Sequence, residues 1–171
     1  MEKKSVVILI HNQFQDMEGV YPYYRLKEEG FDVAFAAPKK EIYRGKYGYS
    51  VTADMTYAEV DTDKMDAIVI PGGWAPDFMR LDKEALRIVR EMNEKNKIIA
   101  AICHAGWVLS SAGVLSGRKV TSYVAIKDDV VHAGAEWVDE PVVIDGNLIT
   151  SRTPDDLPVF VKSLIESLKS S

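Results

Sequence analysis

Three short stretches of the chain are apolar at every position: Val6–Ile10, Ala67–Ile70 and Ile98–Ile102. A strand with one face in water alternates apolar and polar side chains, whereas a strand covered on both faces is apolar throughout. Residues 32–37, DVAFAA, add a further β-rich stretch. These runs predict a parallel sheet with helices packed on both of its faces.

The segments between these strands carry helical signals. Residues 16–30, DMEGVYPYYRLKEEG, predict a helix that ends at Gly30. Because Pro22 lies inside it, we expect a bent first turn or a regular helix that begins near Pro22. Asp82–Lys95 has apolar residues at helical spacing, and Leu157–Leu168 follows a capped start, TPDD. Buried strands that alternate with helices predict an α/β fold.

Two hairpins complete the predicted fold. Residues 41–57, EIYRGKYGYSVTADMTY, are rich in tyrosine, glycine and β-formers, which favours a hairpin or an irregular excursion. In VVIDGNLITS, residues 142–151, two β-rich runs are joined at Asp145-Gly146, a preferred hairpin turn. The length of 171 residues fits one hydrophobic core. We therefore predict one domain over residues 1–171, a flavodoxin-like three-layer sandwich with a mostly parallel sheet and helices on both faces.

Composition limits the classes of partner. The net charge is -5 and no basic stripe is visible, which argues against nucleic-acid binding. No apolar run approaches the roughly 20 residues of a membrane helix. The start, MEKKSVVILIHNQF, lacks the features of a signal peptide, so we expect it to form the first strand. The single cysteine excludes an internal disulfide, and neither a metal nor an organic cofactor is indicated. These features predict a cytoplasmic protein.

Polar and glycine-rich stretches follow three of the predicted strands. They are HNQFQDMEG after the first strand, PGGWAPD after Ile70 and CHAG after Ile102. Ligands of open α/β sheets bind outside the carboxyl ends of the strands. We therefore expect these three stretches to meet at one edge of the sheet.

Cys103, the only cysteine, is predicted at the sharp turn between a strand and a helix. Small residues flank it, as at a nucleophile elbow, which holds a reactive side chain in the open. The N-terminus of the following helix and a nearby imidazolium would both lower the pKa of its thiol. A structural cysteine packed at a strand end fits the same spacing, so the pattern leaves both interpretations open.

Three polar residues are candidate partners of the thiol. His104 is a candidate base, although adjacent residues usually point to different faces, and it needs a third group to orient it. Asp77 is of the right type for that group, but a helix N-cap fits it equally well. Glu18 beside the thiol would have a raised pKa and could donate a hydrogen bond to a thiolate, while an ordinary first-turn glutamate is the alternative.

The PGG turn before Trp74 offers backbone donors. Gly72 and Gly73 admit close approach of a substrate, so their N–H groups could form an oxyanion hole. Pro-Gly-Gly is also a common loop sequence, and the motif alone does not decide between these roles.

Taken together, the chain resembles the PfpI/ThiJ family of intracellular cysteine peptidases. The resemblance rests on FQDMEGVYPYYRLKEEG, VIPGGWAPDFMRL, AAICHAGWVLSSAGVLSGRKVTSY and IKDDVVHAGAEWVDEPVVIDGNLITSRTPDDL, in family order and nearly from end to end. It implies that Cys103 is the nucleophile and His104 the base. It also implies that Glu18 meets the thiol and that Tyr123 lines the pocket.

The resemblance further implies an assembly. In that family the triad acid is a glutamate supplied by a neighbouring subunit, in dimers that build hexameric rings; the matching position here is Asp77, one methylene shorter. A second family acid is replaced by Gln15. Class I glutamine amidotransferases share the cysteine elbow, but their late His-x-Glu pair is absent around His132. We therefore expect a homo-oligomer, a dimer or a hexamer, that acts on peptides or small carbonyl compounds.

Three activities are compatible with these candidate site residues. A cysteine hydrolase of the PfpI type would attack a peptide carbonyl, whereas a glyoxalase or deglycase would attack methylglyoxal or its adducts on amines. Trp74 and Tyr123 would narrow the pocket, which favours small substrates. We predict a cysteine hydrolase of the PfpI type, with glyoxalase or deglycase chemistry as the first alternative. A non-enzymatic oxidation sensor or chaperone built on Cys103 is the second alternative.

Overall fold

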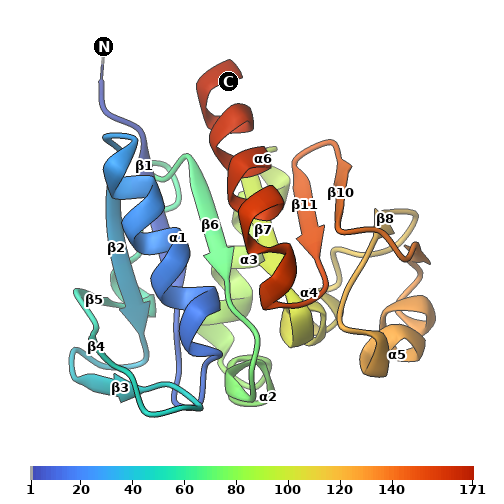
Figure 1. The fold of residues 1–171 in the computed structure, drawn as a ribbon, viewed down its shortest axis with the longest axis horizontal. Helices are drawn as coiled ribbons and strands as arrows, with labels where there is room; N and C mark the ends of the chain where they lie inside the picture. The colour runs from blue at the N-terminus through green and yellow to red at the C-terminus, as the bar shows by residue number, and fades with distance from the viewer. Residues whose placement is uncertain (1) are drawn as a thin grey trace.

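A computed structural model describes residues 2–171 of the chain (Figure 1). Its centre is a seven-stranded sheet in which neighbouring strands are parallel except at one edge, where β10 is antiparallel to β11. The strands, in spatial order, are β10 (Val142–Asp145), β11 (Leu148–Ser151), β7 (Ile98–Ile102), β6 (Ala67–Ile70), β1 (Ser5–Leu9), β2 (Asp32–Ala37) and β5 (Met55–Thr56).

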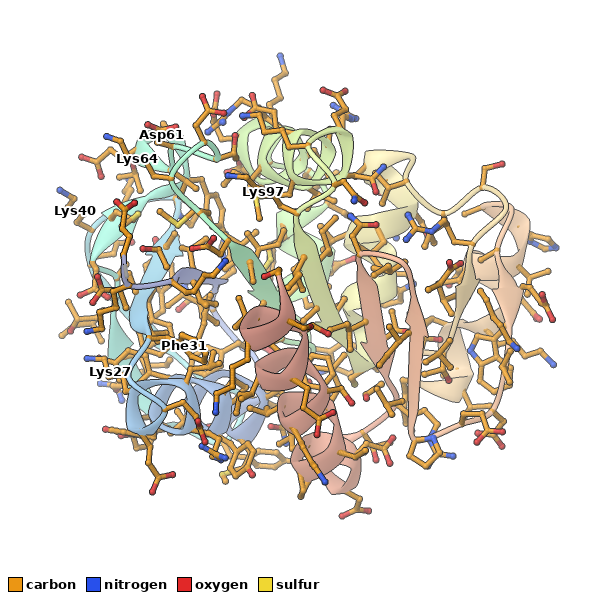
Figure 2. All side chains as sticks on the ribbon, turned by 90° about the horizontal axis from the view of Figure 1, so that it is seen from above. Lys27, Phe31, Lys40, Asp61, Lys64 and Lys97 are labelled. Carbon is orange, nitrogen blue, oxygen red and sulfur yellow. The ribbon has the colours of Figure 1, made fainter. Side chains whose placement is uncertain are left out.

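Helices cover both faces of the sheet, as Figure 2 shows in a view along its layers. Helix α1 packs against α6 on one face, and α3 packs against α4 on the other. The helices of residues 2–171 are α1 (Asp16–Glu28), α2 (Ala75–Met79), α3 (Lys83–Glu94), α4 (Gly106–Ala112), α5 (Lys127–His132) and α6 (Leu157–Ser170). The prediction of a flavodoxin-like three-layer α/β sandwich is therefore confirmed.

The apolar runs form the innermost strands because both of their faces are covered. Every residue of β6 and β7 is buried, and so are the last four residues of β1. Each buried aliphatic side chain of this kind contributes roughly 1.5–3 kcal/mol to folding. Along residues 2–171, no helix has both the length and the apolar character needed to cross a membrane.

Two small sheets flank the main one. The predicted hairpin in residues 41–57 forms as β3 (Ile42–Arg44) and β4 (Ser50–Thr52), and the following residues add β5 to the main sheet. The second small sheet pairs β8 (Lys119–Val120) with β9 (Glu136–Trp137) in parallel. The hairpin predicted at Asp145-Gly146 is confirmed as β10–β11.

The expectation that the regular helix begins near Pro22 is wrong. Helix α1 begins six residues earlier, at Asp16, and Pro22 lies within it. The start is determined by Gln15, whose side chain accepts hydrogen bonds from the N–H groups of Met17 and Glu18. These bonds satisfy the first-turn donors that a helix otherwise leaves free. Capping, rather than the proline, therefore sets the position of Glu18.

The strand order reverses between β1 and β6, which are parallel neighbours although β2 to β5 lie between them in sequence. Such a switch opens a crevice at the carboxyl ends of the two strands. In Figure 1 this edge lies at the bottom, where α2 and the β3–β4 hairpin are also found. The loops after β1, β6 and β7 all reach it.

Candidate active site

Cys103 directly follows β7 in a strained backbone conformation. Its φ is 63°, a left-handed value that is uncommon for a residue with a side chain. One 3-10 turn, Cys103–Ala105, separates β7 from α4, and the N–H of Tyr123 donates to the Cys103 carbonyl at 3.2 Å. Strain of this kind persists where the surroundings impose it, as at active sites. The turn holds the side chain at the carboxyl edge of the sheet, with 8% of the residue exposed.

Glu18 reaches the thiol from the first turn of α1. It is fully buried, and its Oε1 accepts a hydrogen bond from the N–H of Gly72 at 2.8 Å. Its Oε2 is buried without a partner in residues 2–171. Burial raises the pKa of Glu18 to about 8, so the side chain keeps its proton at neutral pH. A protonated carboxyl next to Cys103 can donate a hydrogen bond to a developing thiolate.

The PGG loop donates one hydrogen bond to the carboxyl of Glu18 and also influences the thiol of Cys103. The N–H of Gly72 is occupied by Glu18, so the expectation that it is free for an oxyanion is wrong. The backbone N–H groups of Gly73 and His104 instead act on Cys103, where they favour the charged form of the thiol and lower its pKa. Gly73 has a φ of 76°, and a Cβ there would lie 2.5 Å from the carbonyl oxygen of Gln13. Glycine is therefore required at Gly73 to bring this loop against the loop that follows β1.

The expected lowering of the thiol pKa is also wrong. Burial raises the pKa of Cys103 to about 12, and the charge of Glu18 adds to the rise at a pH where Glu18 is ionised, against the opposing effect of the Gly73 and His104 N–H groups. Helix α4 begins at Gly106, directly after the 3-10 turn that starts at Cys103. The resting thiol is therefore protonated, and it needs a base at the moment of attack.

His104 is placed to be that base. Its Nδ1 lies 3.2 Å from Cys103 Sγ. Burial and, secondarily, the charge of Lys46 lower the pKa of His104, which keeps the imidazole neutral at pH 7. With the proton on Nε2, Nδ1 is free to accept the thiol proton. The strained turn thus overcomes the usual divergence of adjacent side chains.

Asp77 lies apart from this pair within one chain. It is an exposed residue in the first turn of α2, whose N-cap is Trp74, so the N-cap interpretation of Asp77 is wrong. In the described part of the chain, no carboxylate hydrogen-bonds to the ring of His104. Aromatic rings surround the imidazole instead, with centroids at 4.9 Å (Tyr123), 5.0 Å (Trp107) and 5.3 Å (Trp74).

A pocket with a volume of about 340 Å³ opens above Cys103 and His104. It contains Tyr123 and Gly73, as expected, together with residues that sequence reasoning missed. The pocket is lined by Gln15, Lys46, Tyr47, Gly73, Trp74, Cys103, His104, Tyr123, Ala125, Thr153 and Pro154. Over residues 2–171, no three histidine, cysteine, aspartate or glutamate side chains gather in a way that could hold a metal ion.

Glu18→Gln is expected to change how stability depends on pH. The folded protein keeps the Glu18 proton up to about pH 8, whereas the unfolded chain releases it above about pH 4.3. The unfolded state therefore binds fewer protons in this window, and wild-type stability falls as pH rises, by at most about 1.4 kcal/mol per pH unit.

The Glu18→Gln variant has no titrating carboxyl at this position, and its amide oxygen still accepts the hydrogen bond from the Gly72 N–H. Urea unfolding of both proteins at pH 5 and pH 8 measures the difference, in which the titration of all other groups cancels. Between pH 5 and pH 8, the free energy of unfolding of the variant should rise relative to that of the wild type by up to about 4 kcal/mol. Parallel pH dependences would show that Glu18 is already ionised in the folded state.

Fold and site together define an α/β protein with a buried thiol, an imidazole and a carboxyl at the carboxyl edge of a parallel sheet. The model of the DJ-1/PfpI family matches residues 4–167. The chain therefore belongs to the DJ-1/PfpI family.

Named relatives are similar over nearly the whole chain. "Deglycase PfpI" of Pyrococcus furiosus is 48% identical over 165 residues, which cover 96% of this chain and 99% of the relative. "Putative cysteine protease YraA" of Bacillus subtilis is 36% identical over 168 residues, covering 97% and 99%. A crystal structure from Anabaena variabilis, with DJ-1/ThiJ/PfpI-like and ferritin-like domains, aligns with a TM-score of 0.96 and 43% identity. The alignment covers 98% of this chain and 48% of that chain.

Proposed function

We propose that this protein is a cysteine-dependent enzyme that acts on small dicarbonyl compounds such as methylglyoxal, free or as adducts on amines. The observation that carries the proposal is the contact between Cys103 Sγ and His104 Nδ1 at 3.2 Å, inside a pocket of only about 340 Å³. A pocket of this size accepts a few-carbon carbonyl compound more readily than an extended peptide. The deglycase name of the Pyrococcus furiosus relative supports this choice.

The first step forms a bond between Cys103 Sγ and the aldehyde carbon of methylglyoxal. The thiol proton passes to His104 Nδ1 as sulfur attacks, and the aldehyde oxygen becomes an oxyanion. We assign the N–H groups of Gly73 and His104, which favour the charged form of Cys103, to the stabilisation of that oxyanion. Protonation of the oxyanion gives a hemithioacetal. On an amine adduct, sulfur displaces the amine, which leaves with the proton taken from the thiol.

The second stage converts the hemithioacetal into lactate without an external oxidant. His104 or Glu18 carries a proton from the former aldehyde carbon to the adjacent ketone carbon, so that one carbon is oxidised and its neighbour reduced. The product is a lactoyl thioester of Cys103. Water then cleaves the carbon–sulfur bond, which releases lactate and restores the thiol. The net reaction consumes one methylglyoxal and one water for each lactate.

Proton NMR tests the proposed function directly. The wild-type protein should convert methylglyoxal into lactate in equal amounts, and over many turnovers per protein molecule. Methylglyoxal that disappears without lactate would indicate chemical modification of the protein, and no consumption would refute the proposal.

Peptide hydrolysis is the second candidate, favoured by the name of the Bacillus subtilis relative. The same thiol and imidazole could attack a peptide carbonyl, after which His104 would protonate the leaving amine and water would hydrolyse the thioester. Release of new amino termini from short peptides, without lactate formation from methylglyoxal, would establish this alternative. A non-enzymatic oxidation sensor built on Cys103 is the third candidate; formation of a sulfinate at Cys103 that controls partner binding, with no turnover of a carbonyl substrate, would establish it.

We also propose that the active unit is a homo-oligomer in which a neighbouring subunit supplies Asp77 to His104. The proposal is supported by the exposure of Asp77 and by the absence of a carboxylate on the His104 ring within residues 2–171 of one chain. A catalytic thiol must stay reduced, and we therefore place the protein in the cytoplasm.

Subunit mixing tests this assembly. Cys103→Ser and Asp77→Asn proteins should each be impaired, but a refolded equal mixture should recover activity, at about a quarter of the wild-type level for a randomly mixed dimer. In the mixed dimer, one site combines an intact Cys103 with an intact Asp77 from the other chain. A mixture no more active than the mean of the two variants would contradict the shared site.

A further inference from the structure

The charge of the pocket lining is opposite in sign to that of the whole chain. The chain has a net charge of -5. The lining, in contrast, contains the ammonium of Lys46 and no carboxylate, while His104 is neutral. Glu18 lies beneath the pocket, is fully buried and carries a proton at neutral pH. A ligand in this pocket therefore meets one cation and no anion.

Lys46 is held at the pocket by a short loop, residues 45–49, that is fixed to the start of α1. The buried carboxylate of Asp16 accepts hydrogen bonds from the N–H groups of Tyr47 at 2.8 Å and Tyr49 at 2.9 Å. The N–H of Lys46 itself donates to the carbonyl of Phe14 at 2.8 Å. Asp16 and Phe14 belong to the segment that leads from β1 to Glu18, so the cation and the carboxyl are positioned by the same part of the chain.

The ammonium of Lys46 is available to a ligand. In residues 2–171, Lys46 forms none of the ion pairs with N–O distances up to 4.0 Å. Its neighbours are the ring of Trp74, with Nζ 5.4 Å from the centroid, and the ring of Tyr47, at 5.5 Å. Aromatic faces attract the cation without neutralising its charge. The positive charge of Lys46 acts on Cys103, Glu18 and His104 alike, which places it within electrostatic reach of the reacting atoms.

We infer that Lys46 determines substrate specificity by selecting carbonyl compounds that carry a carboxylate, such as methylglyoxal adducts on free amino acids. The inference rests on the proposed function and adds to it a substrate class. One exposed ammonium, with no arginine in the lining, matches a single negative charge rather than a phosphate dianion. Adducts on cationic side chains are disfavoured by the same charge.

Alkylation of Cys103 by two reagents of the same shape tests the inference without requiring turnover. Iodoacetate carries a carboxylate and iodoacetamide is neutral; in both cases sulfur bonds to the methylene carbon and iodide leaves. Because Cys103 is the only cysteine, mass spectrometry reports on this site alone. The ratio of the two rate constants cancels the fraction of thiolate and isolates recognition of the anion.

The rate constant for iodoacetate divided by that for iodoacetamide should be about fivefold higher in the wild type than in Lys46→Met at low salt. This difference should shrink at high salt. Lys46→Arg should retain the wild-type ratio. Lys127→Met is the matched control, because Lys127 also lies over an indole ring, that of Trp137 at 5.0 Å, but outside the pocket.

A Lys46→Met ratio within twofold of the wild type, or an equal fall in Lys127→Met, would overturn the inference. Failure of the proposed function has a different signature. In that case methylglyoxal is not converted into lactate, while the alkylation ratio still depends on Lys46.

Discussion

Cys103→Ser should reduce the formation of lactate from methylglyoxal by about 10³-fold or more, the order seen when a nucleophile is removed. A serine hydroxyl is a far weaker nucleophile, and His104, whose pKa is lowered, is a weak base for it. The chain contains no other thiol that could replace Cys103. Initial rates of lactate formation, measured by NMR or by a coupled assay, give the ratio.

Stability must be measured alongside activity. The Cys103→Ser variant should unfold within about 1–2 kcal/mol of the wild type, because one buried group replaces another of similar shape. Loss of activity with stability retained assigns the effect to chemistry. Residual lactate formation above one tenth of the wild-type rate would show that the thiol is not the nucleophile.

Gly72→Ala is the second change with a large expected effect. A Cβ at Gly72 would lie 2.7 Å from both Cys103 Cβ and Glu18 Oε1, and 2.9 Å from the backbone nitrogen of His104. Real Cβ atoms do not approach so closely, so the thiol, the carboxyl or the turn must move. We expect a loss of about 1–3 kcal/mol in stability from overpacking. The displacement should also lower turnover by about 10²-fold.

Gly30→Ala is the control that separates the loss of turnover from the loss of stability. Gly30 has a φ of 91° and no atoms within 4 Å of an added Cβ, and it lies at the end of α1, outside the pocket. Its replacement introduces backbone strain of about 1 kcal/mol. Turnover measured well below the melting temperature should stay near the wild-type level. If Gly72→Ala lost no more activity than Gly30→Ala, the close packing of Gly72 would have no catalytic role.

The strands of the sheet were predictable because burial on two faces leaves a direct sequence signal. The ranges of β6 and β7 match the predicted ones, and β1 differs by one residue at each end. The meeting of three strand ends was predictable from topology alone. The predicted topology correctly places the Cys103 turn, the PGG loop and Glu18 at one edge of the sheet.

Lys46 could not be placed from the sequence. Its position depends on hydrogen bonds from the N–H groups of Tyr47 and Tyr49 to the buried carboxylate of Asp16, some 30 positions earlier. The β-rich pattern of residues 41–57 does not predict these hydrogen bonds. The pKa of Cys103 was missed for a related reason. Local features predict stabilisation of the thiolate, but the burial that dominates arises from loops distant in sequence. Long-range packing therefore decides the electrostatics that local motifs only suggest.

The central claim is that Cys103 reacts covalently with a carbonyl carbon during turnover. Rapid quenching of the wild-type protein with methylglyoxal, followed by mass spectrometry of the intact chain and of the peptide containing Cys103, tests it most directly. We predict an adduct of one methylglyoxal on Cys103 that forms before lactate, decays as lactate accumulates and is absent from Cys103→Ser. Lactate that accumulates at the full rate with Cys103 unmodified at every time point would contradict the claim.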